Sequence, residues 1–184
     1  GKTDQTHLQV AMQKLGVSLP IRFTEQNEGS FGDTNLLRIC ETLSALVPQK
    51  NKTLFIFDRD NPEIMKKLDE KPKNGRGYQE WGNNVFSFAI PTPPHREDSD
   101  GVCIELYYSE SEVKTQDKDG KRLYFEHELA NELGGSGYVV NPRLKSPSGP
   151  LKIFSKKSET VLDAAGKQVC ISKAVFAEYI KNGE

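Results

Sequence analysis

The sequence has few of the residues that build disulfide frameworks, zinc sites or membrane spans. Its three cysteines, Cys40, Cys103 and Cys170, are far apart and form no Cys-x-x-Cys pair. That spacing excludes a disulfide scaffold and indicates reduced thiols in a cytoplasmic protein. No uninterrupted apolar run exceeds a few residues, so no membrane span is expected. The three histidines do not have the spacing of zinc ligands.

The sequence also lacks an excess of either charge. Its 25 basic and 26 acidic residues leave a formal charge of −1, which excludes nucleic-acid binding through a uniformly basic chain. The charges are nevertheless unevenly distributed. Residues 95–128 include ten acids and five bases, whereas residues 143–173 include seven bases and two acids. This pattern fits either two solvated surfaces or an acidic metal site beside a basic rim for a phosphate backbone.

The first half of the chain alternates between helical and strand-like patterns. Apolar spacing predicts helices over residues 3–15, 33–47 and 62–68. Strands are expected over residues 19–24, 53–57 and 85–90, and residues 53–57 have the unbroken apolar run of a strand buried on both faces. This order predicts an α/β fold with a Rossmann-like parallel sheet.

The second half predicts an irregular α+β C-terminal elaboration. Residues 102–108 fit a strand or a strand that breaks into a helix, and residues 122–129 fit a short strand or helix. Residues 131–150 are rich in Gly, Ser and Pro and are expected to form a loop. A closing helix is expected over 171–181. We therefore expect a core over residues 1–94 and an extension over 95–184 that packs on it.

Asp58 and Asp60 follow the strand predicted at residues 53–57. Ligands of open parallel sheets bind at the carboxyl ends of strands, and two carboxylates two residues apart suit one Mg²⁺ or Mn²⁺ ion. The alternative is that Asp60 or Asn61 simply caps the helix that begins at Pro62. Arg59, between the two acids, is expected either to touch a substrate phosphate or to pair with a neighbouring carboxylate.

Two short motifs resemble those of Toprim domains, the topoisomerase–primase catalytic modules, in the branch of the overcoming-lysogenization-defect nucleases. Gly1-Lys2-Thr3-Asp4 resembles the end of the family's E-G-x-x-D motif. Asp58-Arg59-Asp60 matches its D-x-D motif, with one strand and two helices between them. The resemblance covers about residues 1–110 and returns only at the closing helix.

The resemblance implies that Asp4, Asp58, Asp60 and Glu105 bind Mg²⁺ or Mn²⁺ for phosphodiester cleavage. Lys173 resembles the family's late lysine and would stabilise charge on the phosphate. The family's glutamate would immediately precede Gly1, as would an apolar strand. We therefore expect this chain to bind Mg²⁺ poorly and to be inactive or nearly so. His7 falls on the polar side of the first expected helix, where a minor site role is the less favoured interpretation.

The resemblance also implies partners: a nucleic acid, with DNA favoured over RNA, and an ATPase domain or subunit of a defence or DNA-repair system. No membrane partner is expected, and the oligomeric state stays open. A degenerate Toprim-like fold that only binds is one alternative. A phosphatase of the haloacid-dehalogenase type is another, because Phe57-Asp58-Arg59-Asp60 resembles its nucleophile motif. Pro62, however, stands where that motif has Thr or Val.

Overall fold

The computed structural model describes residues 2–24, 32–71, 77–97, 101–131, 151–154, 161–162 and 167–183. The chain divides into two units. The sheet unit comprises Thr24–Glu97 with Gly101–Cys103, and the helical unit comprises Lys2–Phe23 with Ile104–Glu184. Helix α1 (Lys2–Lys14) therefore groups with the C-terminal half, whereas the sequence analysis placed residues 1–94 together. The loop expected at residues 131–150 lies almost wholly outside the described residues.

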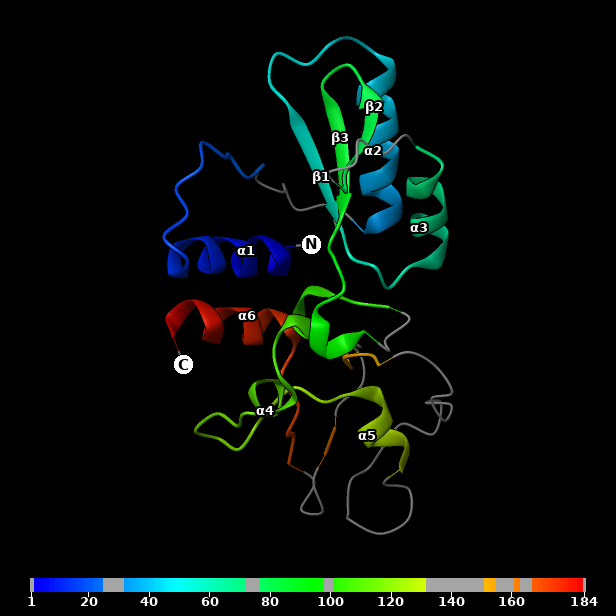
Figure 1. Cartoon of the computed structure of the whole chain (residues 1–184). Coiled ribbons are helices and arrows are strands. Elements are labelled where there is room, and N and C mark those ends of the chain that lie inside the picture. The colour runs from blue at the N-terminus through cyan, green and yellow to red at the C-terminus, as the bar shows by residue number, and fades with distance from the viewer. Residues whose placement is uncertain are drawn as a thin grey trace. The chain divides into compact units, whose positions relative to one another are not determined.

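A small mixed sheet forms the centre of the sheet unit (Figure 1). Its strands are β1 (Thr53–Phe57), β2 (Gln79–Gly82) and β3 (Val85–Ala89), in the order β1-β3-β2. Strands β1 and β3 are parallel, and β2 pairs antiparallel with β3. The α/β class is confirmed, but in the described residues the sheet is mixed rather than wholly parallel. Among those residues β1 has a partner strand on one side only.

The strand that the sequence analysis missed, β2, joins β3 through a two-residue turn. Asn83 and Asn84 both have positive φ, 52° and 61°, which is the backbone of a type I′ hairpin turn. Asparagine tolerates this conformation, and both side chains donate to carbonyl groups outside the turn: Asn83 to Ser44 at 2.7 Å and Asn84 to Gln49 at 2.8 Å. The Gly82-Asn83-Asn84 sequence was the available signal.

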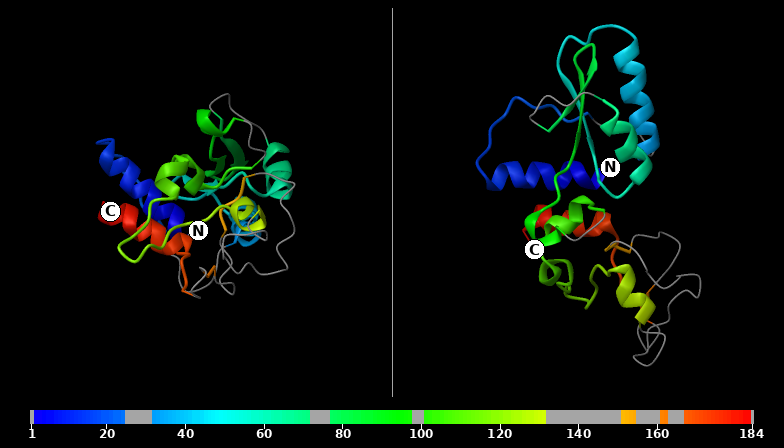
Figure 2. Two further views of the ribbon diagram at one scale, coloured as in Figure 1. Left: turned by 90° about the horizontal axis from the view of Figure 1, so that it is seen from below. Right: turned by 45° about the vertical axis from the view of Figure 1, so that its right-hand side comes forward.

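Helices α2 (Asp33–Ala45) and α3 (Pro62–Asp69) cover one face of the sheet (Figure 2). The side chains buried between them are almost all apolar: Leu37, Cys40, Phe55, Phe57, Ile64, Leu68, Val85 and Ala89. The opposite face is less covered, since Leu54 is 53% exposed. The expectation that β1 is buried on both faces is therefore wrong, because both helices of the unit pack on the same side.

Helix α3 begins where the sequence predicted. Pro62 occupies the first turn, and the Asn61 side chain accepts a hydrogen bond from the backbone N–H of Ile64. The strand predicted at residues 19–24 is wrong, since these residues form neither helix nor strand. Leu19 and Ile21 are 56% and 52% exposed. Alternating apolar residues form a strand only where a neighbouring strand accepts their hydrogen bonds, and Pro20 has no N–H to donate.

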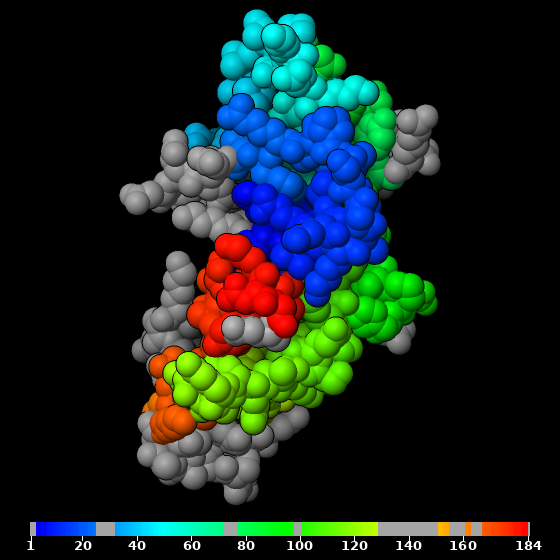
Figure 3. Space-filling model, turned by 90° about the vertical axis from the view of Figure 1, so that its left-hand side faces the viewer, coloured from blue at the N-terminus to red at the C-terminus, as the bar shows by residue number. Residues whose placement is uncertain are grey.

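In the helical unit, α1 packs against the closing helix α6 (Lys173–Asn182), as Figure 3 shows in blue and red. The closing helix is thereby confirmed. The strand expected within residues 102–108 is wrong: Ile104–Tyr107 forms a 3-10 helix, η2. Ile104, Glu105 and Leu106 are all buried whereas Tyr107 is exposed, so the apolar run reflects a mostly buried turn rather than a strand.

The remainder of the helical unit is irregular, as expected. It contains the short helices α4 (Glu110–Val113) and α5 (Glu126–Asn131), while η1 (Pro94–Arg96) belongs to the sheet unit. Isolated bridges join Arg122 to Cys170 and Phe125 to Ile153, so residues 122–129 combine short extended pairings with a helix. A second apolar cluster lies here, formed by Tyr124, Phe154, Val161 and Val169. No helix in the described ranges is long and apolar enough to cross a membrane.

Candidate functional site

The acidic pair predicted at the end of β1 lies at the carboxyl edge of the sheet. Asp58 is half-buried and Asp60 is exposed. Because β1 and β3 are parallel, their carboxyl ends meet at this edge, and the Ile90 N–H donates to the Phe57 carbonyl at 3.0 Å. The edge is where open α/β sheets bind ligands. The predicted position of the pair relative to β1 is confirmed.

Arg59 is bound to the protein through both its backbone and its side chain. Its backbone N–H donates to the Val102 carbonyl at 2.7 Å, and its Nε–H donates to the Ile90 carbonyl at 2.6 Å. These bonds join the residue between the two acids to the end of β3 and to residues 101–103. The sequence analysis expected a substrate phosphate or a neighbouring carboxylate as the partner of Arg59, whereas its Nε–H donates to a backbone carbonyl.

In the helical unit, the structure brings together two residues that the sequence analysis selected 68 positions apart. Lys173 Nζ lies 2.9 Å from Glu105 Oε2. The Glu105 side chain is 1% exposed and that of Lys173 is 24% exposed. Lys173 is the first residue of α6, and the Ser172 side chain caps that helix by accepting from the Val175 N–H. The cap and the ion pair together determine where Lys173 lies.

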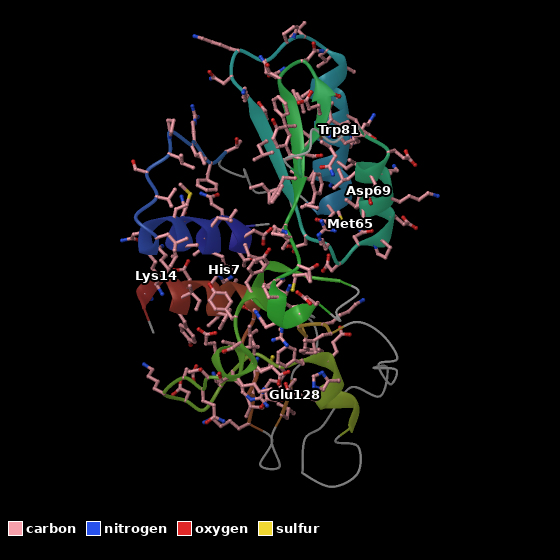
Figure 4. All side chains as sticks on the ribbon, viewed as in Figure 1. His7, Lys14, Met65, Asp69, Trp81 and Glu128 are labelled. Atoms are coloured by element: carbon pink, nitrogen blue, oxygen red, sulfur yellow. The ribbon has the colours of Figure 1, made fainter. Side chains whose placement is uncertain are left out.

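His7 lies beside this ion pair and is buried, so its placement on a polar surface was wrong. Its Nδ1 is 2.9 Å from the Tyr108 hydroxyl, and its ring also packs near Phe176 of α6 (Figure 4). Burial lowers the pKa of His7 below its ordinary 6.5, and Lys173 acts in the same direction. The carboxylates of Glu105 and Asp4 oppose that shift. His7 is therefore favoured in its neutral form.

Two buried polar atoms in this cluster have no hydrogen-bond partner within the described part of the chain. They are His7 Nε2 and Glu105 Oε1. A buried polar atom without a partner costs about 1–3 kcal/mol, so native proteins rarely leave two such atoms in one cluster. Tyr108, the partner of the other His7 nitrogen, has its pKa raised to about 12 by burial and by the charges of Glu112 and Glu105. Its hydroxyl is therefore protonated at neutral pH.

The four predicted metal ligands divide between the units. Asp58 and Asp60 belong to the sheet unit, and Asp4 and Glu105 to the helical unit. Within the ranges that the structure describes, no three His, Cys, Asp or Glu side chains are grouped so as to hold a metal ion. Asp58 and Asp60 fit the chemistry of Mg²⁺, which takes one or two carboxylates together with water and phosphate oxygens. Glu105 Oε2 already accepts from Lys173, whereas Oε1 has no partner among the described residues.

Sequence reasoning demoted His7 and missed Tyr108 as members of the cluster. Asp4 and His7 are three residues apart and share one side of a helix, but a minor site role for His7 was the less favoured interpretation. Nothing in the sequence marked Tyr108 as their neighbour, because it ends a run that fits a strand or a strand that breaks into a helix. Their contact spans 101 residues, and only the packing of the helical unit produces it.

The chain was compared with known protein families, curated proteins and solved structures. No family model, curated protein or solved structure matches the chain. The functional argument therefore depends on the residues described above.

Proposed function

We propose that the chain is a Toprim-like domain for metal-dependent cleavage of nucleic-acid phosphodiester bonds, with DNA as the favoured substrate. The observation that carries the proposal is the Asp58-Arg59-Asp60 turn at the carboxyl edge of the parallel β1–β3 pair. The ion pair of Glu105 and Lys173 supports it, since the resemblance implies that both residues take part in phosphodiester cleavage and the two side chains are in contact. A Rossmann-like parallel sheet, an ATPase partner and a cytoplasmic location belong to the same proposal.

In this mechanism, Asp58 and Asp60 would hold Mg²⁺ or Mn²⁺ through their carboxylate oxygens. The ion, when bound, activates water and neutralises charge on the leaving oxygen. The resemblance assigns to Lys173 the stabilisation of charge on a phosphate, and within the helical unit the Glu105 carboxylate holds the Lys173 ammonium at 2.9 Å. The Lys173 side chain is partly exposed whereas that of Glu105 is buried, so the lysine is the member of the pair that solvent contacts.

A degenerate Toprim-like binding module is the second candidate. The observation that favours it is that Lys173 already neutralises Glu105, and that no three-residue metal group occurs in the described ranges. Nothing in the structure favours the phosphatase, because Pro62 starts α3 directly after the Asn61 cap.

The test follows metal binding and cleavage separately. The ¹⁵N-labelled chain is titrated with MnCl₂, and paramagnetic broadening of amide signals is mapped, because this broadening reports even the weak binding that is expected of this chain. We expect broadening centred on residues 57–61 that Asp58→Asn abolishes. Asp69→Asn, which removes an exposed acid of α3 in the same unit, is the matched control and should leave the broadening unchanged.

Cleavage of plasmid DNA and of DNA and RNA oligonucleotides is then assayed with Mg²⁺ or Mn²⁺. The chain is compared with a version extended upstream by about 15 native residues, which would complete the first strand that the resemblance implies. Cutting by the extended version that Asp58→Asn abolishes would support the nuclease. Nucleic-acid binding without cutting, by chains whose circular dichroism confirms folding, would favour the binding module. Absence of broadening at residues 57–61 would refute the metal site.

A further inference from the structure

We infer that Gly101 and Arg59 are positioning residues that hold the Asp58–Asp60 turn in its metal-binding geometry. This inference rests on the proposed function, because it concerns the same acidic pair. Neither residue is assigned to contact the metal. Both act on the backbone that carries the two carboxylates.

Gly101 lies directly against the turn. A Cβ atom placed on Gly101 would be 3.1 Å from the Asp60 Cα and 3.5 Å from the Arg59 carbonyl oxygen. Both neighbours are backbone atoms, which cannot rotate away as the end of a long side chain does. A contact of 3.1 Å is tighter than most contacts that a Cβ atom makes, so an alanine at position 101 requires the Asp60 backbone to shift by a few tenths of an ångström.

The same segment also forms a hydrogen bond to the turn. Val102, the residue after Gly101, accepts from the Arg59 N–H at 2.7 Å, and its side chain is fully buried. Packing of Val102 in the interior thus fixes the carbonyl that holds Arg59. Gly101 provides the close approach and Val102 provides the bond.

Arg59 holds the opposite side of the turn. Its Nε–H donates to the carbonyl of Ile90, the residue that follows β3, at 2.6 Å. Ile90 is itself buried and donates to Phe57, the last residue of β1. The residue between the two acids is therefore bonded both to residues 101–103 and to the end of the neighbouring strand.

Such support matters because the acids lie where regular β1 pairing ends. Asp60 is exposed and Asp58 is half-buried, so the position of the backbone between them contributes to where both carboxylates lie. Two carboxylates bind one ion well only if the backbone between them is already held, since otherwise binding must order it. Gly101 supplies that order from outside the motif, and Arg59 supplies it from within through its bonds to Val102 and Ile90.

The test uses Gly101→Ala with Gly32→Ala as its matched control. Gly32 lies in the same unit, and a Cβ there would meet nothing within 4 Å. We expect Gly101→Ala to weaken Mn²⁺ binding at residues 57–61 about tenfold, the lower end of the range for groups that support metal ligands. Gly32→Ala should leave Mn²⁺ affinity unchanged.

Two further variants separate positioning from general destabilisation. Ile64→Val removes one methylene from the buried core of the sheet unit and should lower thermal stability without changing Mn²⁺ affinity. Arg59→Lys keeps the positive charge but loses the planar guanidinium and its Nε–H. If Arg59 acts by holding the turn through its Nε–H, Arg59→Lys should weaken Mn²⁺ binding. If Arg59 acts only through its positive charge, Arg59→Lys should leave Mn²⁺ affinity unchanged. Faster hydrogen exchange of the residue 59 amide in Gly101→Ala should accompany its loss of affinity.

The outcomes distinguish this inference from the proposed function. If Asp58→Asn abolishes Mn²⁺ binding while Gly101→Ala and Arg59→Lys retain wild-type affinity, the inference is overturned and the metal site stands. If Ile64→Val weakens binding as much as Gly101→Ala does, the effect is one of stability and the inference fails. If the wild-type chain shows no broadening at residues 57–61, both proposals fall.

Discussion

The two units differ in how completely their buried polar side chains are hydrogen-bonded. In the sheet unit, the buried Ser87 hydroxyl donates to the Gln79 side chain at 3.2 Å and accepts from the Trp81 indole at 2.9 Å. In the helical unit, Glu105 and His7 are buried with one unpartnered atom each. Buried polar groups in the first unit are satisfied, whereas those in the second retain unused hydrogen-bonding capacity.

The candidate site residues also lie in different places in the two units. The acids of the sheet unit lie at an edge, outside the apolar cluster between α2, α3 and the sheet. Changes there should affect ligand binding more than folding. In the helical unit, Glu105 and Lys173 are both candidate site residues and part of the interior. Changes there should affect stability and function together.

The largest expected effect concerns the apolar interior of the sheet unit. Leu68→Ala should lower the free energy of unfolding by about 4 kcal/mol, within the range for a buried leucine. Leu54→Ala makes the same chemical change in β1, but Leu54 is 53% exposed, compared with 1% for Leu68. The control should cost less than about 1 kcal/mol. Urea unfolding measures both, and equal losses would refute the assignment of a single covered face.

The second effect concerns the buried ion pair. Lys173→Met leaves the Glu105 carboxylate buried without its cation and should cost about 2 kcal/mol, less than for a fully buried pair because Lys173 is 24% exposed. The double variant Glu105→Leu with Lys173→Met removes both charges and should recover most of that stability. Hydrogen exchange of α6 amides measures the loss in the helical unit. A double variant no more stable than Lys173→Met would contradict this account.

The third effect is a pH dependence confined to the helical unit. The pKa of His7 is lowered on folding, chiefly by burial, so below its ordinary pKa of 6.5 the unfolded chain binds more protons. Stability that is present above pH 6.5 is therefore lost as the pH falls towards the lowered value. Glu105 and Asp4 favour the protonated form and reduce the effect, whereas Lys173 increases it.

Exchange of α1 and α6 amides between pH 7.5 and 5 measures this dependence. His7→Gln should flatten the profile, because glutamine does not titrate. His95→Gln, which replaces an exposed histidine of the sheet unit, should leave the profile unchanged. An unaltered slope in His7→Gln would assign the dependence to the carboxylates instead.

The smallest effect concerns the β2–β3 turn. Asn84→Ala should destabilise the sheet unit by about 1 kcal/mol more than Asn84→Gly, because alanine is strained at positive φ and glycine is not. Both variants lose the hydrogen bond to Gln49, so the difference between their free energies of unfolding measures the strain of a side chain at positive φ. Equal stabilities of the two variants in thermal unfolding would show that φ at this position is not maintained.

Local signals predicted most of the regular elements. The apolar run of β1, the Pro62 start of α3 and the helical spacing of α6 are each confirmed. Residues 19–24 failed because strand formation needs a partner that local sequence does not encode. The strand expected within residues 102–108 is wrong because a short apolar run has the same pattern in a strand and in a mostly buried 3-10 turn, and only the alternative's helical part agrees with the structure.

The residues of the candidate site also divide into those that a local sequence pattern predicts and those that only tertiary packing brings together. The sequence by itself determined the acidic pair after β1, since an apolar run followed by Asp-x-Asp is a local pattern. Glu105 and Lys173 became candidates only through the resemblance to Toprim domains. Only the tertiary structure decided that these two form a buried ion pair and that His7 and Tyr108 join them, because those contacts depend on how distant segments pack. The closeness of Gly101 to Asp60 arises in the same way, from a backbone approach across 41 residues of chain.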